Sequence, residues 1–503
     1  MKTVLRSLFL LFLCLLISTA AFSNHPKWEP LPDQSVSTRK TNSQKGDFVV
    51  PYLIRKIKLE DVSFYVKGGS QPDVETRFSP DGKYIAIGTF LGQLKIVNIY
   101  TGKVLLDKKI AEGMVKHIDF SPDGSIIYFG EQSYDGFVTA LQIKTGKILW
   151  QYRLADDLKT SSPPTKDNLW GIYSLPGCYR LKVLEGGDVL VLGIHSWGSM
   201  RNINGMTRWS RVYRFTKEGK LKWVFPKAGP MAMTLVYLDS DQKGRRVAIL
   251  SGSPGENTPK NYRWQKGSLY VLNGNDGSLV GAHLFTPLKP YFKDVGFWQS
   301  VSVNSKGTLA SVGMRDGRTF IFDLDLVKPK KIFRFGAPIL ISNVPVSAMA
   351  TYTHIANNGS IYFQTGNSNI PNANTMQEVI TPPGPHPNAN MISVVDEKGK
   401  IKWRYKSGHI YENFWSSKDG RWILTIVKKK TEGLNREFGA LLFDTHRSGG
   451  GSSKRVYYYP VEGLSFFQAD IARDGSAIAV VEIPYQNPET GKLVGTYQVH
   501  IVR

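Results

Sequence analysis

The stretch that decides the fold is Phe120-Ser121-Pro122-Asp123-Gly124, which is followed by two apolar runs and then by Thr145-Gly146-Lys147 and Leu149-Trp150. An altered copy precedes it and begins at Phe78-Ser79-Pro80-Asp81-Gly82. Asp-Gly between alternating apolar runs is a hairpin signal, because it readily takes the positive φ of a tight turn. Each copy therefore holds about four short strands. Repeats that recur every few tens of residues in this form predict a β-propeller.

Further units follow along the chain, separated by similar turn signals. The predicted units are 74–110, 115–154, 179–223, 234–285, 299–335, 347–405, 411–459 and 467–502. The last unit is one strand short, and the segment 52–59 is a strand candidate without a unit of its own. We predict an all-β propeller of about eight four-stranded blades, with seven as the alternative. We expect the N-terminal strand to close the ring, since closure removes free sheet edges.

The beginning of the chain has the pattern of an export signal. Lys2 and Arg6 form a positive region, and an apolar run over 8–21 is too short for a comfortable transmembrane helix. We predict a signal peptide over 1–23 that is cleaved near Asn24, a flexible tail over 24–50 and a single propeller domain over 51–503. No later stretch is long and apolar enough to span a bilayer. We therefore expect a periplasmic or secreted bacterial protein.

The composition indicates a folded and strongly basic protein. Apolar residues make up 41% of the chain and aromatic residues 12%, which is typical of globular proteins. The formal net charge is +23, and removal of the two cations Lys2 and Arg6 with the signal peptide leaves +21. Such an excess favours an acidic protein, an anionic polysaccharide or an anionic membrane surface as partner. Nucleic acid is not expected as the partner of an exported protein.

Cleavage would leave Cys178 as the one cysteine of the mature chain. A lone thiol cannot form an internal disulfide. We expect Cys178 to be a small buried hydrophobic residue, with intermolecular pairing or reactivity as the alternatives. The low cysteine content argues against a disulfide-rich eukaryotic module and fits a bacterial periplasm or cell surface.

Two kinds of propeller repeat share these motifs. The segment 139–152 resembles the repeat of pyrroloquinoline-quinone-type propellers, in which a tryptophan docks between neighbouring blades. The equivalent positions hold Trp150, Trp223 and Trp403, and the departures are Leu106 and Gly281. The Phe-Ser-Pro-Asp-Gly turns resemble those of WD-repeat-like and TolB-like propellers. Both resemblances imply the fold, whereas function has to be argued from a site.

The quinoprotein enzymes of the first family are similar to this chain in the repeat only. They carry adjacent cysteines near the cofactor, and the mature chain has a single cysteine. We find no clear counterpart of their calcium ligands and no Cys-x-x-Cys-His haem attachment site. The chain also resembles a non-catalytic branch of this family, the propeller lipoprotein of the outer-membrane barrel assembly machinery, which binds proteins. This chain lacks the lipobox of that lipoprotein. We therefore expect no cofactor, and leave an enzyme as the alternative.

The nine histidines show no metal-ligand spacing. His195, His354 and His386 are isolated in sequence, and no His-Glu-x-x-His pattern or close carboxylate cluster accompanies them. We therefore predict no metal site and expect each of these histidines to be structural or exposed.

The units differ mainly in the link between their second and third strands. It is short in units one and five and long in four others, over 195–208, 251–266, 366–390 and 428–436. In a propeller these links emerge on the same face as the links between blades, so we expect the long loops to converge around one mouth of the central channel. Loops on a rigid scaffold commonly carry function. The loop over 366–390 is polar, rich in proline and almost uncharged, and we expect a lid, a docking arm or disorder.

Three of the long loops interleave basic and aromatic residues. Such side chains bind phosphates, carboxylates or sulfates while stacking on rings or sugars. The alternative is that they are solvated loop charges with aromatics covering blade edges. The candidate residues for binding an anionic partner are Arg201, Arg208, Trp209, Arg211, Lys260, Arg263, Trp264, Lys266, Lys428, Lys429, Lys430 and Arg436.

These observations favour an exported, non-catalytic propeller that acts as a binding or scaffold protein. We expect its basic, loop-rich face to hold an acidic protein or an anionic envelope polymer. The alternative is a quinoprotein-like dehydrogenase or a polysaccharide-acting enzyme with its site at the mouth of the channel. Convergent carboxylates in the channel would favour the enzyme.

Overall fold

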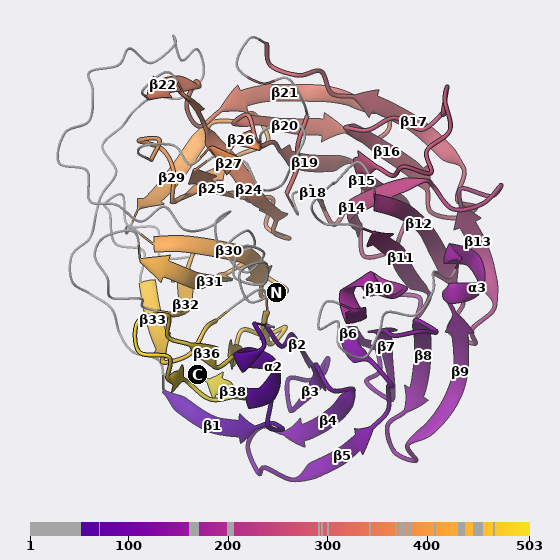
Figure 1. Ribbon diagram of the computed structural model, residues 1–503, viewed down its shortest axis with the longest axis vertical. Helices are drawn as coiled ribbons and strands as arrows, with labels where there is room; N and C mark the ends of the chain where they lie inside the picture. The colour runs from indigo at the N-terminus through magenta and orange to yellow at the C-terminus, as the bar shows by residue number, and fades with distance from the viewer. Residues whose placement is uncertain are drawn as a thin grey trace.

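The computed structural model describes residues 52–69, 71–159, 171–198, 206–289, 292, 295–298, 301–341, 344–367, 370–371, 379–380, 385–406, 409–430, 438–445, 456–465 and 468–503. The predicted signal peptide and tail lie outside these residues. The described strands form eight antiparallel blades of four strands each, arranged in a ring (Figure 1). The pair Gly177 and Gln132 joins blades two and three into one eight-stranded sheet. The prediction of an all-β propeller of about eight blades is therefore confirmed.

The first four blades follow the order of the chain from the channel outward. Blade one contains β2 (Val74–Phe78), β3 (Tyr84–Thr89), β4 (Gln93–Asn98) and β5 (Val104–Lys109). Blade two contains β6 (Met114–Phe120), β7 (Ile126–Gln132), β8 (Phe137–Gln142) and β9 (Lys147–Arg153). Blade three contains β10 (Gly177–Val183), β11 (Val189–Gly198), β12 (Met206–Phe215) and β13 (Leu221–Phe225). Blade four contains β14 (Met233–Ser240), β15 (Arg246–Pro254), β16 (Ser268–Asn273) and β17 (Leu279–Leu284).

The next three blades repeat this order. Blade five contains β18 (Val301–Val303), β19 (Leu309–Gly313), β20 (Arg318–Asp323) and β21 (Lys328–Arg334). Blade six contains β24 (Ala348–Ile355), β25 (Ile361–Asn367), β28 (Met391–Val395) and β29 (Ile401–Lys406). Blade seven contains β30 (His409–Ser416), β31 (Trp422–Lys430), β32 (Phe438–Asp444) and β33 (Val456–Val461).

Blade eight joins the two ends of the described chain, as predicted. It consists of β34 (Ala469–Ile471), β35 (Ile478–Glu482), β38 (Gln498–Val502) and the N-terminal strand β1 (Leu53–Lys58) as its outermost strand. Lys56 pairs with His500 and Lys58 with Gln498 in an antiparallel register. In Figure 1 the indigo β1 lies beside the yellow β38. The N-terminal strand thus gives the last blade its fourth strand.

Short elements occupy some of the connections. They are the helices α2 (Ser63–Lys67) and α3 (Ala155–Leu158), the 3₁₀ turn Gly171–Ser174, and three strand pairs: β22 (Ile339–Ile341) with β23 (Val344–Val346), β26 (Ile370–Pro371) with β27 (Val379–Ile380), and β36 (Tyr485–Gln486) with β37 (Leu493–Val494). No helix within the described ranges is long and apolar enough to cross a membrane.

The Asp-Gly motif forms the turn between the first and second strands. In blade two, Asp123 accepts hydrogen bonds from the Ser121 hydroxyl at 2.5 Å and the Ser125 backbone N–H at 3.1 Å. Gly124 follows with a φ of +72°, which an L side chain rarely adopts. Blades one and seven use the same contact, from Ser79 to Asp81 and from Ser417 to Asp419. The recurring motif is therefore a framework turn.

The repeated tryptophan docks blade two against blade three and blade three against blade four. The indole N–H of Trp150 donates to the Lys217 carbonyl at 2.9 Å, and that of Trp223 donates to the Gly274 carbonyl at 2.6 Å. A Cβ on Gly219 would lie 2.5 Å from the Trp150 ring, so the approach requires glycine. Apolar side chains from facing blades fill the space between the sheets and form the core.

Candidate functional site

The long loop of blade four carries a basic and aromatic group on a fixed base. The structure places this loop over 255–267, which is shorter at its start than the predicted 251–266, because β15 continues to Pro254. Lys260 and Arg263 are exposed, and the Arg263 guanidinium lies over the Trp264 ring at 4.3 Å. Trp264 in turn packs edge-on against Phe225 at 5.1 Å. The loop therefore presents two cations beside an anchored aromatic ring.

Side-chain hydrogen bonds hold this loop to its surroundings. Asn257 accepts from the Arg208 backbone N–H and donates to the Arg208 carbonyl, both at 3.0 Å. The Tyr262 hydroxyl accepts the Ala232 N–H at 2.9 Å, and the Tyr270 hydroxyl accepts the Gln265 N–H at 2.8 Å. These polar contacts hold the start, middle and end of the loop, so the backbone that carries its cations is fixed in place.

Arg208 and Arg211 of blade three, which were expected on an exposed loop, are buried. The link predicted over 195–208 is largely strand, because β11 extends to Gly198 and β12 begins at Met206. Arg208 is 5% exposed and donates to the Pro254 carbonyl, and burial lowers its pKa. Arg211 is 9% exposed and pairs with Asp157 at 2.8 Å. The expectation that Arg208 and Arg211 lie on an exposed loop is therefore wrong; both connect elements of the framework.

Trp209 lies between these two arginines on β12 and is partly exposed. The ammonium of Lys159 lies 5.1 Å from the centre of its ring. Lys159 follows α3 in the link between blades two and three, which belongs to the same face as the loop of blade four. Sequence analysis missed Lys159, because no repeat motif marks the residue that ends a short helix.

The remaining candidate residues are less defined. Lys266, two residues after Trp264 at the end of the loop, is half-buried. Strand β31 extends to Lys430, past the predicted start of a loop at 428, and therefore includes Lys428, Lys429 and Lys430. Arg201 and Arg436 lie outside the described residues, as does most of the predicted loop over 366–390. The short pair β26–β27 and the segment 385–390 are described from that loop.

The three histidines and the cysteine singled out in the sequence are all at least partly buried. His195 and His386 are buried and lie within hydrogen-bonding distance of backbone carbonyls, which confirms structural places for them. His354 contacts the Ser416 hydroxyl at 2.7 Å. Cys178 is fully buried, and burial raises the pKa of its thiol to about 12. Within the described residues, no group of His, Cys, Asp and Glu has the arrangement of a metal site.

A second cluster, which sequence analysis missed, is a ring of polar residues around the channel. We call it the inner collar. It consists of the next-to-last residue of the innermost strand in seven blades: Arg77, Asp119, Lys182, Asp239, Ser302, His354 and Asp470. The corresponding residue of blade seven is Trp415. The sequence does contain a signal for this ring, because a polar residue recurs one position before the end of the innermost strand in seven blades. A polar residue at a single position of each repeat does not stand out from the many other polar residues.

Each member of the inner collar bonds to the next blade. Asp470 accepts the Phe78 N–H at 2.6 Å, and Asp119 accepts the Val183 N–H at 2.9 Å. Asp239 accepts the Val303 N–H at 2.8 Å. The cations alternate with these acids: Arg77 donates to the Ile118 carbonyl at 3.2 Å, and Lys182 lies 2.8 Å from Asp239. Ser302 and His354 continue the chain of contacts into blades six and seven. The collar therefore fastens the blades together.

The innermost strands of blades one and two, β2 and β6, also contain a pair of titratable groups. Glu75 lies 3.1 Å from the His117 ring and accepts a hydrogen bond from Gln468 at 3.1 Å. Burial raises the pKa of Glu75 to about 7 and lowers that of His117 well below its usual value. Next to them, the Arg180 guanidinium lies over the Tyr237 ring at 4.1 Å. Glu75 is therefore a buried carboxyl group that His117 and the Gln468 amide accompany.

Comparisons with known proteins support the fold. No family model matches the sequence, and no curated protein matches it. Among solved structures, the crystal structure of the C-terminal WD40 domain of Sif2 is similar, with a TM-score of 0.54 and 11% sequence identity. The match covers 91% of this chain and 99% of that domain. At this identity the likeness concerns the fold alone, and the chain has a WD-repeat-like β-propeller fold.

Proposed function

We propose that this protein is an exported, non-catalytic β-propeller that holds an acidic partner on its loop-rich face. The partner would be an acidic protein or an anionic envelope polymer. The observation that carries the proposal is the anchored loop of blade four, which presents Lys260 and Arg263 to solvent beside the Trp264 ring. Lys159 over Trp209 repeats the combination of a cation and an aromatic ring on the same face.

The physical basis is the distinction between cations that are already paired and cations that are available. Arg208 and Arg211 bond to carbonyls and a carboxylate of the protein itself, so an external anion gains little from them. Exposed cations next to an aromatic surface combine long-range attraction with a contact of defined shape. The net charge of +23 adds a general attraction for acidic partners.

Two further parts of the proposal rest on the sequence. Export rests on the pattern of residues 1–23, and fractionation of the native cell with a C-terminal tag would test it. The assignment to the non-catalytic branch of pyrroloquinoline-quinone-type repeats rests on the repeat. The docking of Trp150 and Trp223 between blades supports it.

The test of the binding face is retention on a sulfonated matrix at rising salt. We expect a variant with Lys159→Ser, Lys260→Ser and Arg263→Ser to elute at clearly lower salt than the parent protein, because exposed cations act over about one Debye length of roughly 10 Å. The matched control removes three exposed lysines from turns at the opposite end of the ring, with Lys243→Ser, Lys306→Ser and Lys418→Ser. Equal losses in both variants would show that net charge alone matters, and the proposed face would be wrong.

The enzyme alternative has one observation in its favour: Glu75, on the innermost strand of blade one, has a pKa that burial raises to about 7. A carboxyl group with such a pKa can act as a general acid near neutral pH. Turnover of an alcohol or a polysaccharide that is abolished by Glu75→Gln and kept by Glu131→Gln would support this alternative. Glu131 is a matched control, because burial raises its pKa to about 7 as well.

A further inference from the structure

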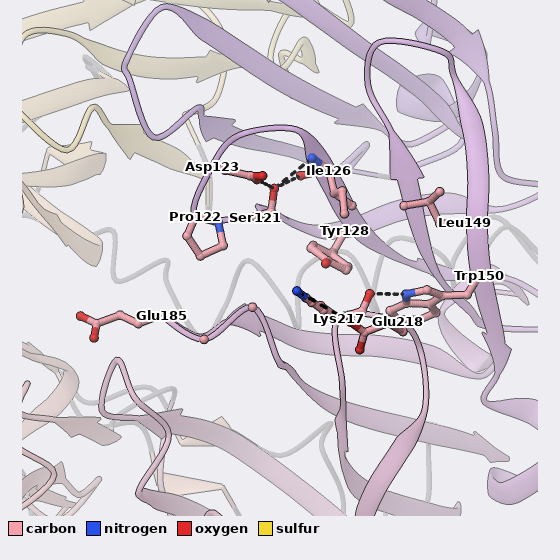
Figure 2. A pocket seen from close by; sticks show the side chains of 12 residues that line it. Ser121, Pro122, Asp123, Ile126, Tyr128, Leu149, Trp150, Glu185, Lys217 and Glu218 are labelled. Atoms are coloured by element: carbon pink, nitrogen blue, oxygen red, sulfur yellow. Dashed lines mark hydrogen bonds and ion pairs between the residues drawn. The ribbon is translucent and has the colours of Figure 1, made fainter.

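A groove of about 560 Å³ opens between blades two and three, at the end of the ring opposite the loop-rich face. Figure 2 shows its walls. Blade two contributes the turn with Asp123 and the edge of β9 with Leu149 and Trp150, and blade three contributes two turns, at 185–187 and 217–218. The Tyr128 ring lies at its base. The groove therefore follows the junction of two blades.

The groove is acidic, in contrast to the rest of the chain. Asp123, Glu185 and Glu218 line it together with the single cation Lys217. Hydrogen bonds from Ser121 and the Ser125 backbone lower the pKa of Asp123, and a hydrogen bond with the Thr216 side chain lowers that of Glu218. Both carboxyl groups are therefore charged at neutral pH.

A buried polar atom at the base of the groove has no partner. Tyr128 is fully buried and lines the groove, and its hydroxyl forms no hydrogen bond among the described residues. An unpaired buried hydroxyl costs free energy, so such groups are normally satisfied. A bound group that reaches Tyr128 would therefore gain a hydrogen bond that the protein itself does not make.

The next junction shows what fills the equivalent space. Arg214 on β12 pairs across the sheet with Leu190 and Trp223, in the same way that Ala140 on β8 pairs with Tyr128 and Trp150. Ala140 and Arg214 therefore hold equivalent positions in blades two and three. Where blade three has a long cationic side chain, blade two has a methyl group.

The Arg214 guanidinium occupies the junction between blades three and four. It donates to the carbonyls of Gly244 and Gly274 at 3.0 and 2.7 Å, and it pairs with Asp188 at 2.8 Å. Gly274 corresponds to Lys217, because each accepts the hydrogen bond of the docked tryptophan. Gly244 corresponds to Gly187, since each closes the turn between the first and second strands. The turns around Arg214 thus match the turns that wall the open groove.

We propose that the groove between blades two and three binds an arginine side chain of a partner protein. The guanidinium lies between the turns of blade three, as Arg214 lies between those of blade four, and donates to the Tyr128 hydroxyl. Asp123 and Glu218 balance its charge, and its aliphatic stem packs on Leu149, which is 43% exposed, and on Trp150. This site is independent of the proposed acidic-partner face, because the two lie at opposite ends of the ring.

The direct test uses a defined peptide and the whole mature protein. Acetyl-Gly-Arg-Gly-amide is titrated while Trp fluorescence and NMR shifts report binding, and the peptide with citrulline in place of arginine is the matched control. We expect the arginine peptide to bind at least about tenfold more tightly, since hydrogen bonds to charged groups contribute more than neutral ones. Equal binding of the two peptides, or no binding of either up to about 10 mM, would overturn the proposal.

Variants locate the binding within the groove. Ala140→Arg should place the protein's own guanidinium in the groove and abolish peptide binding. Two further variants test the same site without filling it, in case Ala140→Arg does not fold. One is Tyr128→Phe, and the other combines Asp123→Asn with Glu218→Gln. We expect each to weaken binding about tenfold. The control pair Asp81→Asn with Asp276→Asn changes the same turn positions in blades one and four and should leave binding unchanged. Equal effects of both pairs would show only non-specific attraction, and the groove would not be the site.

Discussion

Two neighbouring groups of cations show how differently one residue type is used in this protein. The arginines of β12 point into the framework, where Arg214 is 7% exposed and bonds to two carbonyls and a carboxylate. The cations of the adjacent loop, Lys260 and Arg263, lie in solvent. A basic residue in a propeller blade is therefore not evidence of a binding face until its own partners are known.

The largest effect is expected from removing a framework cation. Arg214→Ala should lower the free energy of unfolding by about 3 kcal/mol, because it removes the buried partner of Asp188 and of the Gly244 and Gly274 carbonyls. Urea denaturation monitored by Trp fluorescence measures the change. The salt bridge from Lys222 to Asp188, at 2.9 Å, remains in the variant and limits the loss. A change below about 0.5 kcal/mol, which is typical of surface positions, would contradict the assignment of Arg214 to the framework.

A second effect is expected at the closure of the ring. Glu482 on β35 accepts hydrogen bonds from Gln498 and the Thr496 N–H and lies 2.7 Å from His500. Burial opposes its ionisation, but these partners prevail and lower its pKa from 4.5 to about 2. Since the pKa is lower in the folded state, the stabilisation is present above about pH 4.5 and is lost as the pH falls towards 2.

Glu482→Gln should therefore lower the stability at pH 7 by about 2 kcal/mol, in proportion to lost charged hydrogen bonds. The difference from the parent protein should shrink as the pH falls from 4.5 to 2. Urea denaturation at several pH values measures it. A difference that stays constant over this range would show that the charge of Glu482 is not responsible.

The third effect has the opposite sign and concerns the channel. Burial raises the pKa of Glu75 from 4.5 to about 7, so the folded state binds its proton more tightly than the unfolded state. The stability that depends on this proton is present below about pH 4.5 and is lost as the pH rises towards 7. Glu75→Gln should raise stability at pH 8 and change it little at pH 4. Denaturation at these two pH values tests the sign; a loss of stability at pH 8 would contradict it.

The smallest effect on stability is expected on the loop. Arg263→Ala should change the free energy of unfolding by less than about 0.5 kcal/mol, as exposed substitutions commonly do. The same variant should weaken retention on the sulfonated matrix. A large loss of stability would mean that the contact of Arg263 with Trp264 supports the fold, and the contrast with Arg214 would fail.

Much of the fold could be predicted from the sequence because its signals are local. Asp-Gly turns such as Asp123-Gly124 end strands wherever they occur, and all eight units were located within a few residues of the blades. The missing fourth strand of the last unit also predicted the closure by β1. The site was harder to predict. Lys260, Arg263 and Trp264 do share a loop surface, but Arg208 and Arg211 were placed in a loop although β12 begins at Met206.

By itself, the sequence determined the repeat, the approximate number of blades, the closing strand and the excess of positive charge, since these depend on turn residues, alternation and composition. Only the tertiary structure decided which charges are enclosed. The inner collar joins residues from seven blades, and the pair of Glu75 with Gln468 connects positions almost four hundred residues apart. Likewise, only the structure shows that Ala140 and Arg214 hold equivalent positions, and that turns of the following blade surround the Arg214 guanidinium. Charge is a property of a residue, whereas burial and pairing are properties of its neighbours.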